Sequence, residues 1–139
     1  MASRSACDLC PEMRSKLVEF LTRARLAKID VLIYCTYRSK EEQNALYSQG
    51  RTAPGPKVTW TKKSKHNVTD ANGRPSAEAW DCVPMVNGKC AWNAKEIYLQ
   101  LAAIASAIGG LRWGGDFNGD GVPFERGEYD SPHFELVRK

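Results

Sequence analysis

The two histidines of this 139-residue chain lie in two short polar segments that are far apart in the sequence. His66 belongs to Ser-Lys-His at 64–66, and His133 belongs to Asp-Ser-Pro-His-Phe-Glu at 130–135. A carboxylate, Asp81, follows the first histidine inside an apolar stretch. Two imidazoles and one carboxylate leave one position of a tetrahedral zinc ion open for water, as catalytic zinc requires. A fold that uses this set must bring all three residues to one point.

Each histidine also has a simpler interpretation. His66 can be a surface residue of a loop, and His133 a hydrogen-bonded residue of the core. The pattern around His133 predicts a strand, in which alternate residues face opposite sides, so that His133 and Glu135 share one face and Phe134 packs on the other. Asp81 has a similar setting, and two strands can therefore aim an imidazole and a carboxylate at one site.

Length and composition indicate one domain, residues 1–139, because a chain of 15.5 kDa with 42% hydrophobic residues can bury one core but is too short for two ordinary domains. The formal charge of +4 is spread along the chain. A positive charge of this size suits an anionic polymer as target, but we expect no nucleic-acid partner. We expect the protein to be a monomer. Five cysteines are an odd number, for which free thiols are the default in a reducing compartment.

The beginning of the chain and its apolar segments bear on localisation. No apolar run approaches the roughly 20 residues that cross a bilayer, and the first residues lack a secretory apolar region. We therefore expect no membrane insertion, and a protein that stays in the cytoplasm of its host until it is released to its target.

The order of predicted elements favours an α+β fold. Helices are expected over 11–27, from a capping box at Ser39 and Glu42 to Gly50, and from a cap at Asn93 to Gly109. Strands are expected over 31–35, 80–85, 90–92, 111–113 and 132–137, and a loop over 50–64. We predict a small antiparallel sheet packed by about three helices, with the zinc site at the sheet.

Three short motifs follow one another between residues 37 and 135. They are Tyr37-Arg38-Ser39-x-x-x-Gln43-x-x-Leu46-x-x-x-Gly50, then Ser64-x-His66 with Ala79-x-Asp81, then Asp130-x-Pro132-His133-Phe134-Glu135. Together they resemble the signatures of phage endolysins of the L-alanyl-D-glutamate peptidase type. These are zinc peptidases that cleave bacterial peptidoglycan and share a fold with D-alanyl-D-alanine carboxypeptidases. The resemblance covers about residues 30 to 137.

The resemblance implies a role for each matching residue. His66, Asp81 and His133 would bind zinc, and Asp130 would be the general base that takes a proton from the attacking water. Arg38 would face the substrate, where its fork of donors can hold a carbonyl oxygen or a carboxylate, although it can also be a surface ion-pair partner. Gln43 and Ser64 are candidate substrate-binding residues, and Gln43 can instead face solvent.

One departure from the family concerns the spacing of the ligands. Fourteen residues separate His66 from Asp81, whereas the usual motif has six, and Asp-Ala-Asn-Gly-Arg-Pro at 70–75 looks like an inserted turn. Asp70 is therefore a rival ligand. We prefer Asp81, because it enters a strand and because an aspartate in a turn needs no metal to explain it.

A second cation site is indicated by Asp-Phe-Asn-Gly-Asp-Gly at 116–121, which repeats the first half of an EF-hand loop. Its calcium ligands would be Asp116, Asn118 and Asp120, completed by Glu125 or Glu128. Position 12 is Gly127 rather than glutamate, and a plain turn explains the pattern equally well.

The sequence therefore predicts a zinc endopeptidase that cuts the peptidoglycan stem peptide, at the L-alanyl-D-glutamate bond, for lysis of the host cell. A D,D-carboxypeptidase or dipeptidase of the same fold is the alternative enzyme. A non-catalytic wall-binding module is the alternative from another class, although a module that only binds has no need of an open metal site.

Overall fold

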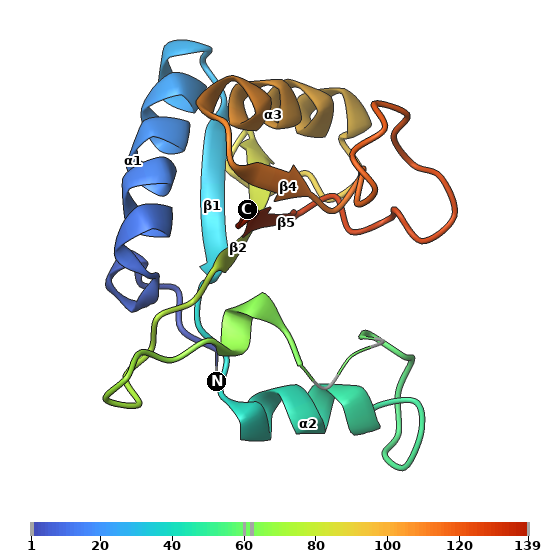
Figure 1. Ribbon diagram of the computed structural model, residues 1–139. Coiled ribbons are helices and arrows are strands. Elements are labelled where there is room, and N and C mark those ends of the chain that lie inside the picture. Colours follow the sequence, from blue (N-terminus) through green and yellow to red (C-terminus); the bar gives the residue numbers. More distant parts are fainter. Residues whose placement is uncertain (1, 60, 62, 139) are drawn as a thin grey trace.

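The computed structural model describes residues 2–59, 61 and 63–138, and its helices and strands are interspersed along the chain (Figure 1). The helices are α1 (Pro11–Leu26), α2 (Lys40–Ser48) and α3 (Lys95–Ile108), with short 3₁₀ turns η1 (Ala6–Asp8) and η2 (Lys65–Asn67). The strands are β1 (Asp30–Cys35), β2 (Ala79–Val86), β3 (Lys89–Cys90), β4 (Leu111–Trp113) and β5 (His133–Leu136). They form one antiparallel sheet in the order β1-β2-β5-β4, with β3 paired to β2 as a hairpin. The predicted α+β fold is confirmed.

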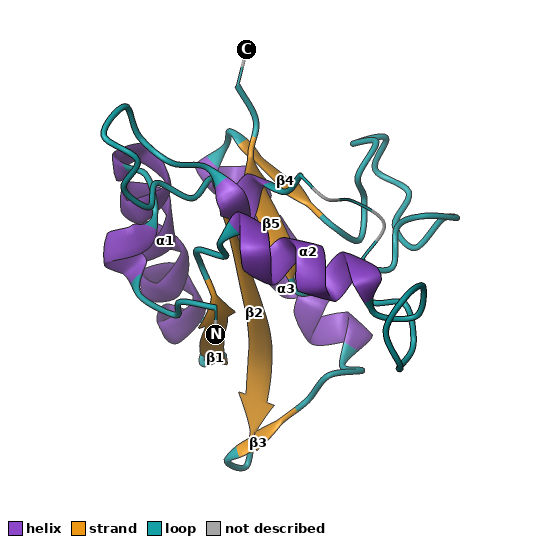
Figure 2. Cartoon of the chain, turned by 90° about the horizontal axis from the view of Figure 1, so that it is seen from below, coloured by secondary structure: helices purple, strands orange, loops and turns teal. Residues whose placement is uncertain are grey.

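The core lies between the sheet and the pair α1 and α3. Phe20 of α1 contacts the rings of Trp80 on β2 and Phe134 on β5, each with ring centroids 5.2 Å apart, and all three side chains are fully buried. Burying one such side chain contributes roughly 1.5–3 kcal/mol. Helix α2 lies on the other side of the sheet (Figure 2). The polar face of β2 and β5 therefore faces α2 rather than the core.

The helices begin where local sequence signals predict in two of three cases. Pro11 begins α1, and Ser39 caps α2 with the predicted capping box, in which its hydroxyl accepts from the Glu42 N–H at 3.0 Å. The prediction that Asn93 caps α3 is wrong. The helix begins one residue later, with Ala94 as a cap that makes no side-chain hydrogen bond, because the Asn93 carbonyl instead accepts from the Lys95 N–H in a turn.

An irregularity in β1 determines what faces the polar side of β2. The register of β1 against β2 shifts between Ile33 and Cys35, so that Tyr34 has no partner and Cys35 stands opposite Asp81. On the other side of β2, Asp81 stands opposite His133 of β5. The central strand thus places Asp81 between a cysteine and a histidine.

The described helices include none that is both long and apolar enough to span a bilayer. All five cysteines carry free thiols.

Candidate metal centre

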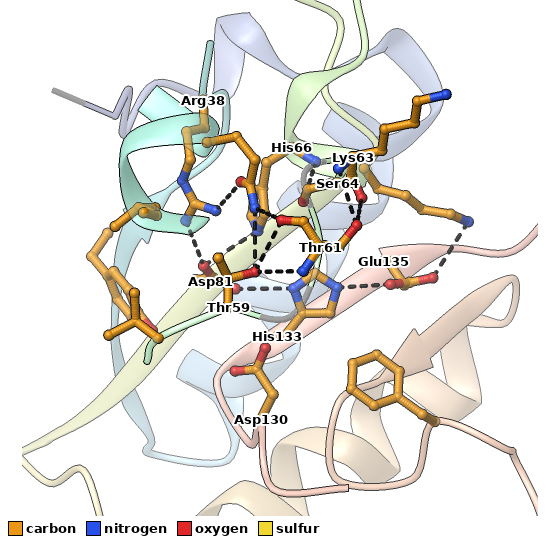
Figure 3. Close-up of a pocket in the computed structure, with 16 residues that line it drawn as sticks. Arg38, Thr59, Thr61, Lys63, Ser64, His66, Asp81, Asp130, His133 and Glu135 are labelled. Carbon is orange, nitrogen blue, oxygen red and sulfur yellow. Dashed lines mark hydrogen bonds and ion pairs between the residues drawn. The ribbon is translucent and has the colours of Figure 1, made fainter. Parts of the chain in front are cut away.

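Three of the predicted ligands, His66, Asp81 and His133, come together on the polar face of the sheet (Figure 3). Asp81 Oδ2 lies 3.3 Å from His66 Nε2, and Asp81 Oδ1 lies 3.2 Å from His133 Nδ1. The imidazole centroids are 5.2 Å apart. All three residues are buried, with 2%, 7% and 7% of their surfaces exposed. One carboxylate therefore contacts two imidazoles at the floor of a pocket.

The ring of His66 is oriented by the backbone of β1. Its Nδ1–H donates to the Thr36 carbonyl at 2.8 Å, which leaves Nε2 as the nitrogen with a free lone pair. Nε2 is buried and has no hydrogen-bond partner among the described residues, although Asp81 lies close to it. The Ser64 hydroxyl accepts from the His66 N–H at 3.1 Å, so the structure gives Ser64 a positioning contact; its predicted contact with substrate stays a prediction.

The ring of His133 is oriented by its neighbour on the strand. Its Nε2–H donates to Glu135 Oε1 at 2.8 Å, and Lys65 Nζ lies 3.5 Å from the other oxygen of Glu135. This bond leaves His133 Nδ1 facing Asp81. A carboxylate on the far nitrogen of a histidine is the usual support of a metal ligand, because it fixes the tautomer and raises the basicity of the ring.

The electrostatics of the cluster are dominated by Asp81. Burial alone would lower the pKa of His66, but the nearby Asp81 carboxylate, 3.3 Å from Nε2, outweighs this effect and raises the pKa to about 10. Burial likewise opposes the rise for His133, whose pKa reaches about 9 because Asp81 and Glu135 both accept from it. The imidazoles in turn hold the pKa of Asp81 far below its usual range, against the effect of burial. A pocket that attracts protons this strongly also attracts a dication, which would displace them.

Two rivals for the ligand set have different surroundings. Asp70 is exposed, and its Oδ1 accepts from the N–H groups of Asn72 and Arg74, as expected for a turn. Cys35 was not anticipated from the sequence; a ligand atom from each of Cys35, His66 and Asp81 lies within 4.8 Å of the others. Its Sγ lies 3.6 Å from His66 Nδ1, the nitrogen that already donates to the Thr36 carbonyl.

Arg38 and Gln43 form one unit above Asp81. Arg38 Nη1 donates to Gln43 Oε1 at 2.8 Å, and its Nη2 lies 3.8 Å from Asp81 Oδ2. Gln43 is fully buried rather than facing solvent, and its amide donates to the Thr61 carbonyl at 2.7 Å. It therefore ties the loop after α2 to the guanidinium, and its predicted contact with substrate stays a prediction.

The cluster forms the floor of a pocket of about 500 Å³. Asp130 stands at its exposed rim, and Tyr34 and Phe117, neither predicted from the sequence, also line it. The crowded rim partly desolvates Asp130 and raises its pKa, an effect that His133 opposes and Asp81 adds to. The pocket therefore contains a second carboxylate, that of Asp130, besides the cluster of His66, Asp81 and His133.

Comparison with known proteins decides the family. A family model described as phage L-alanyl-D-glutamate peptidase matches residues 1–137. The chain belongs to this family. It is 31% identical over 137 residues to the peptidoglycan L-alanyl-D-glutamate endopeptidase CwlK of Bacillus subtilis, which covers 94% of this chain and 74% of the relative. The crystal structure of the L-Ala D-Glu endopeptidase ChiX of Serratia marcescens matches with a TM-score of 0.67 at 20% identity, over 99% of this chain and 89% of that one. This second likeness supports the fold.

Proposed function

We propose that the chain is a zinc-dependent endopeptidase that hydrolyses the L-alanyl-D-glutamate bond of the peptidoglycan stem peptide. The observation that carries the proposal is the convergence of His66 Nε2, His133 Nδ1 and the Asp81 carboxylate on one buried point, with Nε2 lacking any hydrogen-bond partner in the described chain. A buried polar atom without a partner is costly unless something binds it. Membership of the peptidase family supports the reaction and the bond.

His66, Asp81 and His133 would hold the zinc, and the set of two nitrogens and one carboxylate oxygen fits that metal. When bound there, zinc would polarise the scissile carbonyl and lower the pKa of a water towards neutrality. Thr36 and Glu135 would keep the two imidazoles in the required tautomers, since each accepts the proton of the nitrogen that faces away from Asp81.

Asp130 would act as the general base. Its backbone is fixed on both sides, because its N–H donates to the Gly114 carbonyl at 3.3 Å and its carbonyl accepts from the His133 N–H at 3.0 Å. The carboxylate thus has a fixed relation to the strand that carries the last ligand. It would accept the proton of the attacking water and pass it to the leaving amine.

The cations around the pocket would bind the substrate. Arg38 would hold the carbonyl oxygen as negative charge develops on it, since the Gln43 contact fixes one edge of its fork. Lys63 and Lys65 line the same pocket, and their charge suits the carboxylates of a stem peptide. We propose that the protein acts as a monomer and that its reaction serves lysis of a phage host.

Digestion of purified peptidoglycan, with mass spectrometry of the soluble products, tests the proposal. Cleavage at the proposed bond leaves L-alanine on the glycan and releases peptides that begin with D-glutamate. Release of D-alanine alone would instead indicate a D,D-carboxypeptidase, and binding to the wall without release would indicate a non-catalytic module. Metal analysis of the same preparation should give about one zinc per chain.

A further inference from the structure

The loop between β4 and β5 contains an acidic cluster outside the pocket that the proposed reaction uses. In Figure 1 it is the long orange-to-red loop beside β4. One carboxylate oxygen from each of Asp116, Asp120 and Glu128 lies within 4.8 Å of the others. Exposed carboxylates gather on many surfaces, so this proximity alone identifies nothing.

Glu128 distinguishes this cluster from an ordinary acidic surface. Glu128 is only 3% exposed, and the one hydrogen bond that its carboxylate makes with the described residues is at Oε2, which accepts from the Asn118 N–H at 3.1 Å. Its Oε1 is buried and has no hydrogen-bond partner among the described residues, whose ion pairs do not include Glu128. Asp116 Oδ1 is likewise buried with no partner in the part of the chain that the structure describes, while Asp116 Oδ2 accepts from the Gly121 N–H at 3.0 Å. Two unpartnered oxygens thus belong to one cluster, although a buried charge is costly unless it is paired or binds a metal.

We propose that Asp116, Asp120 and Glu128 bind a calcium ion, with Asp116 Oδ1 and Glu128 Oε1 as buried ligands. All of these donors are hard oxygens, and the turn carries the Asp-x-Asn-x-Asp-Gly spacing of calcium loops. Glu128, twelve residues after Asp116, supplies the acidic ligand that position 12 lacks. Magnesium fits less well, because it keeps its waters and demands octahedral geometry.

The other predicted ligands of this loop have different places. Asn118 directs its amide nitrogen to Asp120 Oδ2 and Glu125 Oε1, at 3.3 and 3.4 Å, and its Oδ1 accepts from the Asp120 N–H. Glu125 contacts Asn118 and also Asp120, whose hydrogen bond raises the pKa of the Glu125 carboxyl, but it is not one of the three residues whose oxygens lie together. The proposed calcium ligands are thus fewer than the sequence indicated, because Asn118 and Glu125 are not among them. Glu128 completes the set.

The loop also contacts the zinc pocket directly. The Phe117 ring, next to Asp116, packs against the ring of His133 with centroids 5.7 Å apart. At the start of the loop, the Gly114 N–H donates to the His133 carbonyl at 2.7 Å and the Gly114 carbonyl accepts from Asp130. A cation that fixes Asp116 and Glu128 therefore fixes the segments that hold Phe117 and Asp130. Calcium binding is expected to raise the rate of wall hydrolysis, and this consequence alone rests on the proposed function.

Calorimetric titration of the zinc-loaded full chain with calcium chloride tests the site without reference to activity. We expect a dissociation constant of roughly 10⁻⁴ to 10⁻³ M, as in extracellular calcium modules, and weaker binding of magnesium. Glu128→Gln should weaken calcium binding at least ~10-fold, and should also raise the melting temperature in calcium-free buffer, because it removes an unpaired buried charge. Glu125→Gln is the matched control: it removes a charge beside Asp120 but no proposed ligand, and should therefore weaken calcium binding less than Glu128→Gln does.

Three results would overturn the site. They are no calcium binding by the wild type at calcium concentrations about 10-fold above the expected dissociation constants, unchanged calcium affinity in Glu128→Gln, or equal losses of calcium affinity in Glu128→Gln and Glu125→Gln. The last result would mean a diffuse acidic surface. The rate of wall hydrolysis is then measured with and without calcium at constant zinc. Binding without a change in rate would remove the coupling to the pocket and leave the site, whereas loss of the rate response in Glu128→Gln supports both.

Discussion

Gly114 offers a direct test of how strictly the position of Asp130 controls the reaction. A Cβ added at Gly114 would lie 2.1 Å from the Asp130 carbonyl oxygen, 2.9 Å from its carbonyl carbon and 3.0 Å from its Cβ. Real Cβ atoms essentially never approach closer than 3.0 Å, so Gly114→Ala must displace the Asp130 backbone by about 0.9 Å. A misplacement of about 1 Å can cost ~100-fold in rate, which is about 2.7 kcal/mol of transition-state stabilisation.

The assay compares kcat for wall hydrolysis, zinc content and melting temperature for Gly114→Ala and a control. We expect zinc to be retained, because no metal ligand is replaced, and kcat to fall by ~100-fold. The clash should also cost roughly 1–3 kcal/mol of stability. Gly73→Ala is the control: Gly73 has φ of +76°, and a Cβ added there would meet no described atom within 4 Å apart from its chain neighbours, so alanine costs about 1–2 kcal/mol in backbone conformation without touching the pocket. A Gly114→Ala protein with the kcat of Gly73→Ala would refute the base role that we assign to Asp130.

Five further substitutions test the roles around the proposed metal site. Asp130→Asn should keep zinc and lose at least ~100-fold in kcat, the usual scale for loss of a general base; loss of zinc would make Asp130 a ligand. Metal analysis should find no zinc in Asp81→Ala, whereas Cys35→Ser and Asp70→Ala should retain zinc. Zinc retained in Asp81→Ala but lost in Cys35→Ser or Asp70→Ala would assign the ligand role to Cys35 or Asp70 instead. Glu135→Gln should weaken zinc affinity by ~10–100-fold in a chelator competition, because the support of His133 is weaker; unchanged affinity would make Glu135 irrelevant to the metal.

The sequence predicts the elements of the fold better than their arrangement. Local signals act within a few residues, so Pro11 and the Ser39 capping box locate two helix starts correctly. At α3 the local signal is ambiguous, since Asn93 can cap a helix or form a turn, and the structure has the turn. The strand order β1-β2-β5-β4 depends on contacts between segments about 50 residues apart, for which no local pattern exists.

The residues of the candidate site divide in the same way. His66, Asp81 and His133 are visible in the sequence because few residue types bind zinc and the chain has two histidines. Cys35 was missed because it faces Asp81 only through the register shift in β1, which arises from pairing with β2. Glu128 could be listed among several acidic residues of its loop, but only the folded chain distinguishes its buried carboxylate from the exposed one of Glu125.

The fourteen residues between His66 and Asp81 explain why the order of motifs is more informative than their spacing. Each proposed ligand is held by its own contacts: the His66 carbonyl accepts from the Arg38 N–H and its ring donates to Thr36, while Asp81 is fixed by pairing within the sheet. The intervening chain turns back on itself, because the Ser76 N–H donates to the Val68 carbonyl at 2.9 Å. Residues between those two positions form an exposed turn, whose length changes loop entropy only slowly. An insertion there therefore alters the spacing of the ligands without moving either of them.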